Sequence, residues 1–289
     1  MKEVKFPSGF KRVLGAWDPG YQGRLVEYDG YRWHVGVEEG EYPVLLEDLV
    51  YYYPLVIKYL GLEEREIAVS IPAETFLKDK DTVSLMKEKI EKETGARTVV
   101  YPQGIIALAG LEIDTRGGIL VLDGGFNTLN AAIVDREGED IKVKWLKTYY
   151  NELGVRDLLE KYFREELLRK FSEVPNNFQL LSRIFTRGYV DTGFKKVDVS
   201  AEKNVSLEVF LNLLLRRLRG DVARAERDVN LIVVVGGLGY YFKDLKIEST
   251  KEILVPEHVE FANVRGMYAA SGFPSVDFGF GQVKAILAD

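Results

Sequence analysis

The segment ILVLDGGFNTLNAAIVD, from Ile119 to Asp135, holds two apolar runs separated by an acid and two glycines. Apolar runs of this length are typical of buried strands, and Asp-Gly is a strong signal for the turn of a β-hairpin. The same residues allow a second interpretation, because a glycine backbone lets an anion approach closely. The Asp123 carboxylate would then hold the metal ion of that anion. The sequence therefore predicts a hairpin and leaves open whether this hairpin is also an anion site.

Composition limits the chemistry of such a site. The chain of 289 residues has no cysteine and two histidines, His34 and His258, which excludes disulfides, thiolate nucleophiles and histidine metal clusters. Any metal ion would be a hard cation on oxygen ligands. The net charge of -6 disfavours nucleic acid as the main partner. No apolar run reaches the roughly 18 residues of a membrane span, and the N-terminal residues lack a signal-peptide core. We therefore expect a cytoplasmic protein without direct membrane contact.

The order of the predicted elements indicates an α/β protein. Strands and helices alternate over residues 1–147, and longer amphipathic helices dominate beyond them. We predict a first domain over residues 1–147 and a second over residues 148–261, with residues 262–289 packing back on the first. The chain length suits one large or two medium domains. The first domain and residues 119–135 each carry a strand–DxG–strand element, a faint sign of internal duplication.

Local signals predict the individual elements. Residues 29–30, Asp-Gly, predict a hairpin turn. Pro54 is expected to kink or end a helix within residues 42–61, and Asp81 is expected to cap a helix that closes at Gly95. Other predicted elements are helices over residues 103–111, 153–171, 206–228 and 261–273, an irregular stretch over residues 174–204, and a buried strand over residues 229–235.

Three glycine-bearing turns follow predicted buried strands: Asp18 with Gly20, Asp123 with Gly124 and Gly125, and Gly236 with Gly237. Each turn alone is more typical of a plain hairpin than of a phosphate site. In combination, two acid-tipped hairpins could hold a triphosphate from opposite sides, with backbone amides donating to the phosphate oxygens. The two carboxylates would hold a hydrated Mg²⁺, and the last turn would let the chain approach a ribose and an adenine.

Five segments in this order resemble the motifs of the actin-like ATPase superfamily. WDPGYQG resembles phosphate-1, PQGIIALAG connect-1, LVLDGGFNTLNAAIV phosphate-2, VVVGGLGYYF the adenosine motif and FANVRGMYAASG connect-2, and together they bracket residues 13–272. Within the superfamily the chain is most similar to the ParM-type plasmid-segregation actins. The resemblance implies an actin-like (ribonuclease H-like) fold of two domains with a central nucleotide cleft.

The resemblance also implies a role for particular residues. Asp18 and Asp123 would hold Mg²⁺ through water, and Gln103 would orient the attacking water. Asn127 would either contact the terminal phosphate or only complete the turn. The remaining residues implied to contact the nucleotide are Gly20, Tyr21, Arg24, Gly124, Gly125, Gly154, Gly236 and Gly237. Arg183 and Arg187 fall where family helices approach the base and ribose, although a solvated surface role is the preferred interpretation for both.

One position departs from the family pattern. Family members usually carry a lysine seven residues after the phosphate-1 aspartate, where it reaches the phosphates. Here that position is Leu25, and the nearest cation is Arg24. A shift of one residue along a strand moves a side chain to the opposite face. Either a bulge returns Arg24 to the phosphates, or this hairpin binds phosphate with its backbone alone.

The resemblance implies a function as well. The protein would bind ATP or ADP with Mg²⁺, hydrolyse ATP and polymerise head to tail into filaments. An adaptor protein would connect these filaments to plasmid or other DNA. Two alternatives stay open from the sequence: a nucleotide-binding regulator that does not polymerise, and a small-molecule kinase of the same superfamily.

Overall fold

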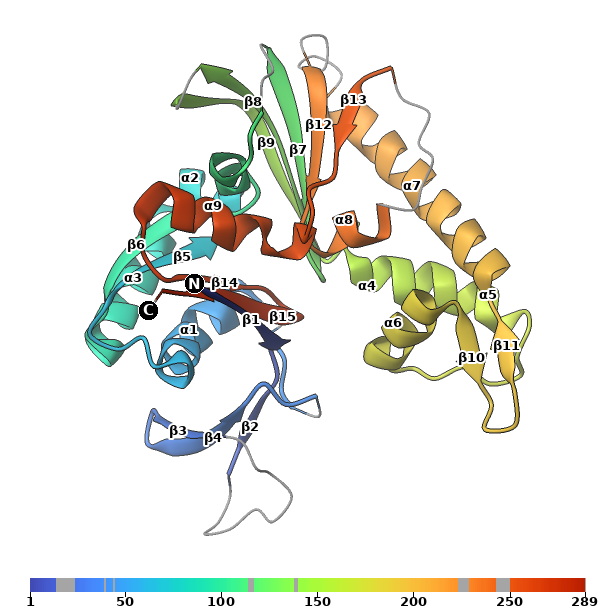
Figure 1. Ribbon diagram of the computed structural model, residues 1–289, viewed down its shortest axis with the longest axis horizontal. Coiled ribbons are helices and arrows are strands. Elements are labelled where there is room, and N and C mark those ends of the chain that lie inside the picture. Colours follow the sequence, from blue (N-terminus) through green and yellow to red (C-terminus); the bar gives the residue numbers. More distant parts are fainter. Residues whose placement is uncertain are drawn as a thin grey trace.

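A computed structural model describes residues 1–13, 24–38, 40–43, 45–113, 117–137, 140–222, 229–242 and 250–288. Its first sheet has the strand order β1 (Lys2–Pro7), β15 (Gln282–Leu287), β14 (Ser275–Phe278), β5 (Glu66–Ile71) and β6 (Arg97–Pro102). Strands β14, β15 and β1 pair antiparallel, and β5 runs parallel to both β14 and β6. The two ends of the chain therefore lie side by side in one sheet (Figure 1).

The second sheet has the strand order β13 (Glu252–Leu254), β12 (Val229–Val235), β7 (Gly118–Gly124), β8 (Thr128–Glu137) and β9 (Asp140–Tyr150). Strands β7, β8 and β9 pair antiparallel as a meander. Strand β12 runs parallel to β7, and β13 runs parallel to β12. The hairpin predicted at Asp123 is thus the β7–β8 hairpin of this sheet.

Both sheets have the same arrangement, three antiparallel strands beside two parallel ones. In the second sheet the antiparallel strands β7, β8 and β9 follow one another along the chain. In the first sheet the equivalent strands are β14, β15 and β1. The first two of these lie near the C-terminal end of the given chain and the third lies near its N-terminal end. The molecule is therefore internally duplicated, and the partner of the β7–β8 hairpin is the β14–β15 hairpin.

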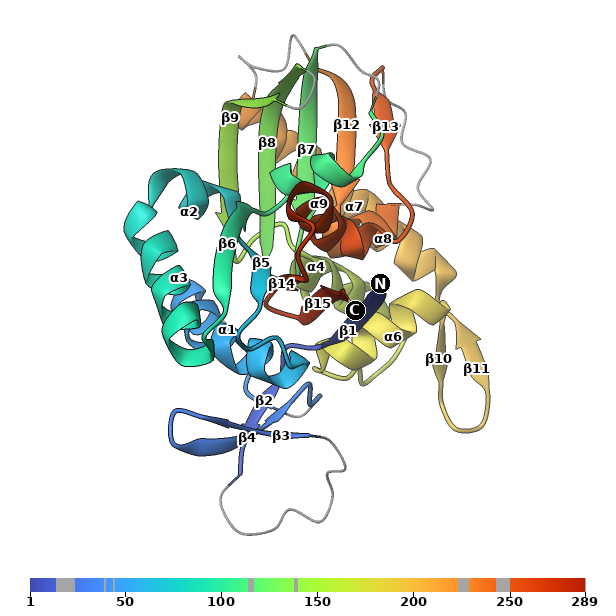
Figure 2. The ribbon, with the colours of Figure 1, turned by 60° about the vertical axis from the view of Figure 1, so that its left-hand side comes forward.

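Helices cover both faces of the sheets. Helices α1 (Leu46–Leu60) and α3 (Lys80–Thr94) pack on one face of the first sheet. The 3-10 helix η1 (Ile105–Gly110) and helix α9 (Ala262–Ser271) contribute to apolar clusters with both sheets, and α9 lies between them (Figure 2). The outer face of the second sheet packs against α7 (Ser200–Val222) and the helical segment formed by α4 (Val155–Asp157), η2 (Leu158–Phe163) and α5 (Arg164–Leu168).

Alternation along β7 explains why two helical layers can cover it. Leu120 and Leu122 contribute to the cluster with α7, whereas Ile119 and Val121 contribute to the cluster with η1 and α9. Successive side chains of a strand point to opposite faces, so a continuous apolar run is buried on both sides. The run ILVL is therefore the centre of the second sheet.

Smaller elements complete the fold. Strands β2 (Phe10–Arg12), β4 (Tyr31–Val35) and β3 (Leu25–Tyr28) form a third sheet, in which the predicted turn at Asp29 and Gly30 joins β3 to β4. Residues 174–204, expected to be irregular, contain helix α6 (Phe178–Arg187) and a hairpin of β10 (Tyr189–Asp191) and β11 (Lys196–Asp198). The remaining short elements are α2 (Ala73–Lys78), α8 (Gly236–Phe242) and η4 (Val259–Phe261).

Two helix boundaries also differ from the predictions. Helix α1 continues through Pro54, because its apolar face is buried on the first sheet and tertiary packing offsets the lost backbone hydrogen bond. Helix α3 begins two residues earlier than expected, since Asp79 rather than Asp81 accepts a hydrogen bond from the Thr82 amide. The helix ends at Gly95 as predicted.

The proposed division of the chain at Lys147 stays a prediction. Strand β9 runs across this position, and β7 and β8 share a sheet with β12 and β13. Because β7, β8 and β9 belong to the second sheet, the strand order favours a domain boundary ahead of β7. Among the described residues, no helix is long and apolar enough to cross a membrane.

Candidate functional site

Residues from both sheets line one cavity of about 440 Å³. The hairpins β7–β8 and β14–β15, strand β1 and helix α9 supply charged and amide side chains to it. Helices α6 and α8 supply another part of the lining, including Phe178, Ser182, Arg183, Tyr240 and Tyr241. The volume and mixed lining suit a ligand of the size of a small cofactor.

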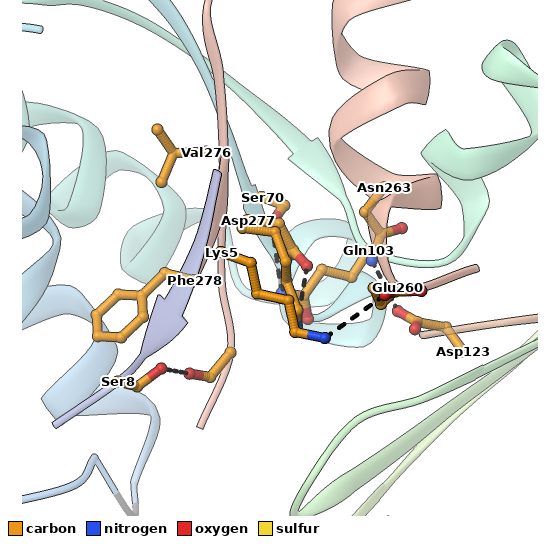
Figure 3. A network of polar contacts seen from close by, with 12 residues as sticks. Lys5, Ser8, Ser70, Gln103, Asp123, Glu260, Asn263, Val276, Asp277 and Phe278 are labelled. Atoms are coloured by element: carbon orange, nitrogen blue, oxygen red, sulfur yellow. Dashed lines mark hydrogen bonds and ion pairs between the residues drawn. The ribbon is translucent and has the colours of Figure 1, made fainter. Parts of the chain in front are cut away.

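Two buried carboxylates face each other in this cavity. Asp123 ends β7 and Asp277 lies in β14, and the two are 5% and 4% exposed. Burial raises the pKa of Asp123 to about 6, and the nearby charge of Asp277 adds to this shift. Figure 3 shows the two acids pointing toward the same space from opposite sides. The two duplicated hairpins therefore bring one acid each to a common site.

Polar side chains orient the Asp277 carboxylate. Its Oδ1 atom accepts hydrogen bonds from Ser70 Oγ at 2.5 Å and from Gln103 Nε2 at 2.9 Å. Its Oδ2 atom lies 3.9 Å from Lys284 Nζ. One oxygen is thus held by β5 and the segment after β6, while the other faces a cation. Gln103, the expected water-orienting residue, therefore contacts Asp277 directly (Figure 3).

Helix α9 orients the Asp123 carboxylate. Asn263 Nδ2 donates to Asp123 Oδ2 at 3.1 Å, and Asn263 Oδ1 accepts from the Gly104 amide at 2.9 Å. The Gly125 amide donates to the Thr128 carbonyl at 2.7 Å, which closes the hairpin turn. The two interpretations of this segment are therefore compatible, since the segment is a hairpin and its acid points into the cavity.

The turn from β12 into α8 passes tightly behind Asp123. Gly236 has φ +75°, and a Cβ atom added there would lie 2.3 Å from Asp123 Oδ1 and 2.7 Å from the Gly124 carbonyl oxygen. Only glycine fits this position, because the dihedral is left-handed and the space is already occupied. Gly236 and Gly237 both line the cavity, where the sequence placed the adenosine motif.

The other predicted residues are distributed more widely. Gly125 lines the cavity, whereas Gly124 packs against Leu238. Asn127 and Gly154 line a separate cavity of about 140 Å³. Asp18, Gly20 and Tyr21 lie outside the described residues.

The structure separates Arg24 from the cavity. This residue is exposed, and its Nη1 atom donates to the Tyr59 carbonyl at the end of α1. Strand β3, which follows Arg24, belongs to the third sheet and not to the sheets that carry the two acids. The expectation that Arg24 supplies a cation to the site was therefore wrong.

The sequence interpretation missed Asp277 and Lys284. The segment SVDFGFGQVKAIL, residues 275–287, is a second strand–DxG–strand element, and Lys284 follows Asp277 by seven residues. The same spacing after Asp18 leads to Leu25, where the family pattern expects a lysine. The signal was present in the sequence, but it lies beyond the segment that resembles connect-2, where no phosphate hairpin was expected.

Comparisons with known proteins identify the fold. No family model matches the chain, and no curated protein matches it. Among solved structures, the archaeal actin homologue Ta0583 in complex with ADP is similar with a TM-score of 0.69 and 19% identity, covering 92% of both chains. A ParM filament from Clostridium botulinum is similar with a TM-score of 0.62 and 15% identity, covering 85% of this chain and 82% of that one.

A third similar structure is the Alp12 filament, with a TM-score of 0.58 and 13% identity, covering 91% of this chain and 88% of that one. The mixed α/β chain, with its two duplicated sheets, therefore has the actin-like fold. Its structural relatives include ParM-type proteins.

Proposed function

We propose that this protein binds ATP or ADP with Mg²⁺ in the cavity between the two acid-bearing hairpins. The observation that carries this proposal is the pair of buried carboxylates, Asp123 and Asp277, facing each other with Lys284 beside the second. Asp277 and Lys284 take the roles that the sequence resemblance gave to Asp18 and to the missing lysine. The phosphate-1 motif, first in the order of the family motifs, is then the last one in this chain.

The chemistry of the cavity fits a hydrated Mg²⁺. Asp123 has a raised pKa because it is buried near a second acid, and a divalent cation would compensate both charges. Mg²⁺ usually takes one or two carboxylates and completes its shell with water and phosphate oxygens. In the part of the chain that the structure describes, no group of three or more acids or histidines could hold a metal ion. Two carboxylates acting through water are therefore the expected ligands, and the ion would neutralise phosphate charge.

The remaining residues have separate tasks in this proposal. The amides of Phe126 and Phe280, at the two hairpin turns that line the cavity, would donate to phosphate oxygens, because the Gly125 and Gly279 amides already donate within their turns. Lys284 would neutralise phosphate charge. Gln103, held at Asp277, would accept a hydrogen bond from the attacking water with its amide oxygen. Gly236 and Gly237 would let the chain approach the nucleoside.

We further propose that nucleotide binding drives polymerisation. Two of the similar structures are filaments, of ParM and of Alp12, and a third is an ADP complex. A terminal phosphate held by hairpins of both sheets would favour one angle between them, and a filament would accept that angle. Head-to-tail contacts that do not close produce a filament. Hydrolysis would weaken the contacts within the filament. We propose that the filament segregates plasmid DNA through an adaptor protein.

The test uses purified protein with Mg-ATP, Mg-ADP or ATP with EDTA. We expect binding of ATP and ADP by titration, and sedimentable filaments, visible by electron microscopy, with Mg-ATP only. Asp277→Ala should weaken Mg-ATP binding by about a hundredfold, because it removes one of two carboxylates that hold the metal. Asp81→Ala, which removes an exposed acid of α3, should change neither binding nor sedimentation.

Other outcomes would select the alternatives. Nucleotide binding without sedimentation favours a regulator that does not polymerise. Phosphate transfer that requires an added hydroxyl compound favours a kinase. Unchanged Mg-ATP affinity in Asp277→Ala contradicts the proposed site.

A further inference from the structure

Three residues lie side by side across the antiparallel strands of the first sheet. Asp277 pairs with Lys284, and Lys284 pairs with Lys5. The equivalent row in the second sheet is Asp123, Asn130 and Thr148. Directly paired residues of an antiparallel sheet project from the same face. The duplicated sheets thus differ in charge, because the first carries two lysines where the second carries neutral side chains.

Both lysines line the cavity. Like charges directly opposite each other on neighbouring strands are destabilising, and Lys284 is already close to the Asp277 carboxylate, at 3.9 Å. Lys5 pairs with Glu260 instead, with 3.5 Å between Nζ and Oε1, and this pair is the more exposed to solvent, because the Lys5 side chain is 36% exposed and that of Lys284 is 13% exposed. An anion in the cavity would relieve the repulsion between the lysines and could draw Lys5 away from Glu260.

We propose that Lys5 binds the terminal phosphate of a nucleoside triphosphate and exchanges Glu260 for it. The proposal rests on the function proposed above. Lys5 and Glu260 lie in the same part of the cavity as Gln103, Asp123 and Asp277 (Figure 3), which is where the end of a triphosphate would lie. Lys284 suffices for the phosphates of a diphosphate, and Lys5 then stays with Glu260. Lys5 therefore distinguishes the triphosphate from the diphosphate.

The exchange has a structural consequence. Lys5 belongs to β1 of the first sheet, whereas Glu260 belongs to η4, which leads into α9 between the two sheets. The ion pair is a link between these elements in the absence of triphosphate. When Lys5 turns to the phosphate, this link is released and the ligand connects the two sheets instead.

The experiment measures the affinities of Lys5→Met and Glu260→Gln for Mg-ATP and Mg-ADP. We expect Lys5→Met to weaken Mg-ATP binding by about tenfold to a hundredfold, with a change of less than about threefold for Mg-ADP. We expect Glu260→Gln to strengthen Mg-ATP binding, because it removes both the competing partner of Lys5 and a negative charge near the phosphate. If the ion pair were only structural, both variants would change the affinity for Mg-ATP in the same direction.

Lys2→Met is the matched control, because Lys2 is an exposed residue of the same strand that does not line the cavity. It should leave both affinities unchanged, and thermal melting should show that all variants fold. Equal effects of Lys5→Met on ATP and ADP, or no effect on either, would overturn the inference.

Inorganic triphosphate separates this inference from the proposed function. If the unmodified protein binds inorganic triphosphate through Lys5 and binds no nucleotide, the proposed function fails and the role of Lys5 stands. If it binds nucleotides with no contribution from Lys5, the proposed function stands and the inference fails. Absence of binding to both probes overturns both.

Discussion

At the scale of single residues, Asp123 shows how the site opposes the stability of the fold. Its carboxylate is buried, and its pKa rises to about 6 because of burial and the charge of Asp277. The hydrogen bond from Asn263 compensates only part of this cost. Lys284 compensates one of the two buried acids, and a buried pair with excess negative charge destabilises a fold unless a ligand supplies the missing positive charge.

This cost predicts a dependence of stability on pH. Between pH 4 and pH 6 the unfolded chain releases the Asp123 proton while the folded chain keeps it, so the contribution of Asp123 to the stability of the metal-free protein falls as the pH rises. Asp123→Asn removes the charge and can still accept from Asn263. We expect this variant to be more stable than the parent by on the order of 2 kcal/mol at pH 7, with the difference vanishing near pH 4.

Chemical denaturation without Mg²⁺ at pH 4 and pH 7 measures this difference. Added Mg²⁺ and ATP should reverse its sign at pH 7, because the parent binds the ligand and the variant does not. A variant that is less stable than the parent at pH 7 in the absence of ligand would contradict the assignment.

Sequence reasoning predicted part of the cavity lining at this scale. Asp123, Gln103 and Gly236 come together around the cavity as the motifs predicted. Lys284 was missed and Arg24 was preferred in its place. The reason is that the usual order of the family motifs along the chain was used to choose which hairpin faces Asp123. Strands β1 and β15 come from opposite ends of the given chain. Their pairing cannot be predicted from a local sequence pattern.

At the scale of elements, helix α6 encloses the cavity beside α8. Arg183 on α6 forms two hydrogen bonds of 2.8 Å with the Glu38 carboxylate, and Gln179 donates to Tyr42 at 2.6 Å. These contacts connect α6 to the segment after β4. The sequence suggested no helix here because its single apolar face is short. In the structure, Leu181, Ile184 and Phe185 pack that face into the core of the second sheet.

The N-terminus of α6 gives a second prediction. The Asn177 side chain accepts hydrogen bonds from the Gln179 and Leu180 amides, which would otherwise lack partners. Asn177→Ala should lower the free energy of unfolding by about 1 kcal/mol, measured by urea denaturation. Asn176→Ala, at the exposed position just before it, should have almost no effect. Equal effects of the two substitutions would show that the cap does not determine the stability of this helix.

At the scale of the whole molecule, the two sheets repeat one arrangement of strands. The second sheet uses β7, β8 and β9 in chain order, and the first uses β14, β15 and β1. The sequence hinted at this duplication but assigned the hairpin near Asp18 as the partner of Asp123. The actin-like fold was predictable because most motifs keep their usual order, whereas the position of one hairpin was not.

This arrangement predicts that the chain tolerates a different order. A chain that starts at Phe273, runs to Ala288, continues through a short Gly/Ser linker to Met1 and ends at Gly272 should fold. Lys2 and Leu287 are paired neighbours, so a few residues suffice to join them. We expect the reordered protein to bind Mg-ATP with the affinity of the parent.

The matched control uses the same linker with new ends inside β7, between Val121 and Leu122, where the strand is buried in the second sheet. This control should not fold. Circular dichroism and nucleotide titration measure both proteins. A reordered chain that fails to fold would contradict the equivalence of the two sheets.

The pairing of β1 with β15 (Figure 1) also bears on how the protein is made. Strand β1 is synthesised before β15, its neighbour in the sheet, and the second sheet is synthesised between the two. Asp277 and Lys284 belong to the late strands β14 and β15. A nascent chain therefore has no complete pair of acids until β15 has been synthesised, and it cannot assemble with its neighbours through a bound nucleotide before that moment.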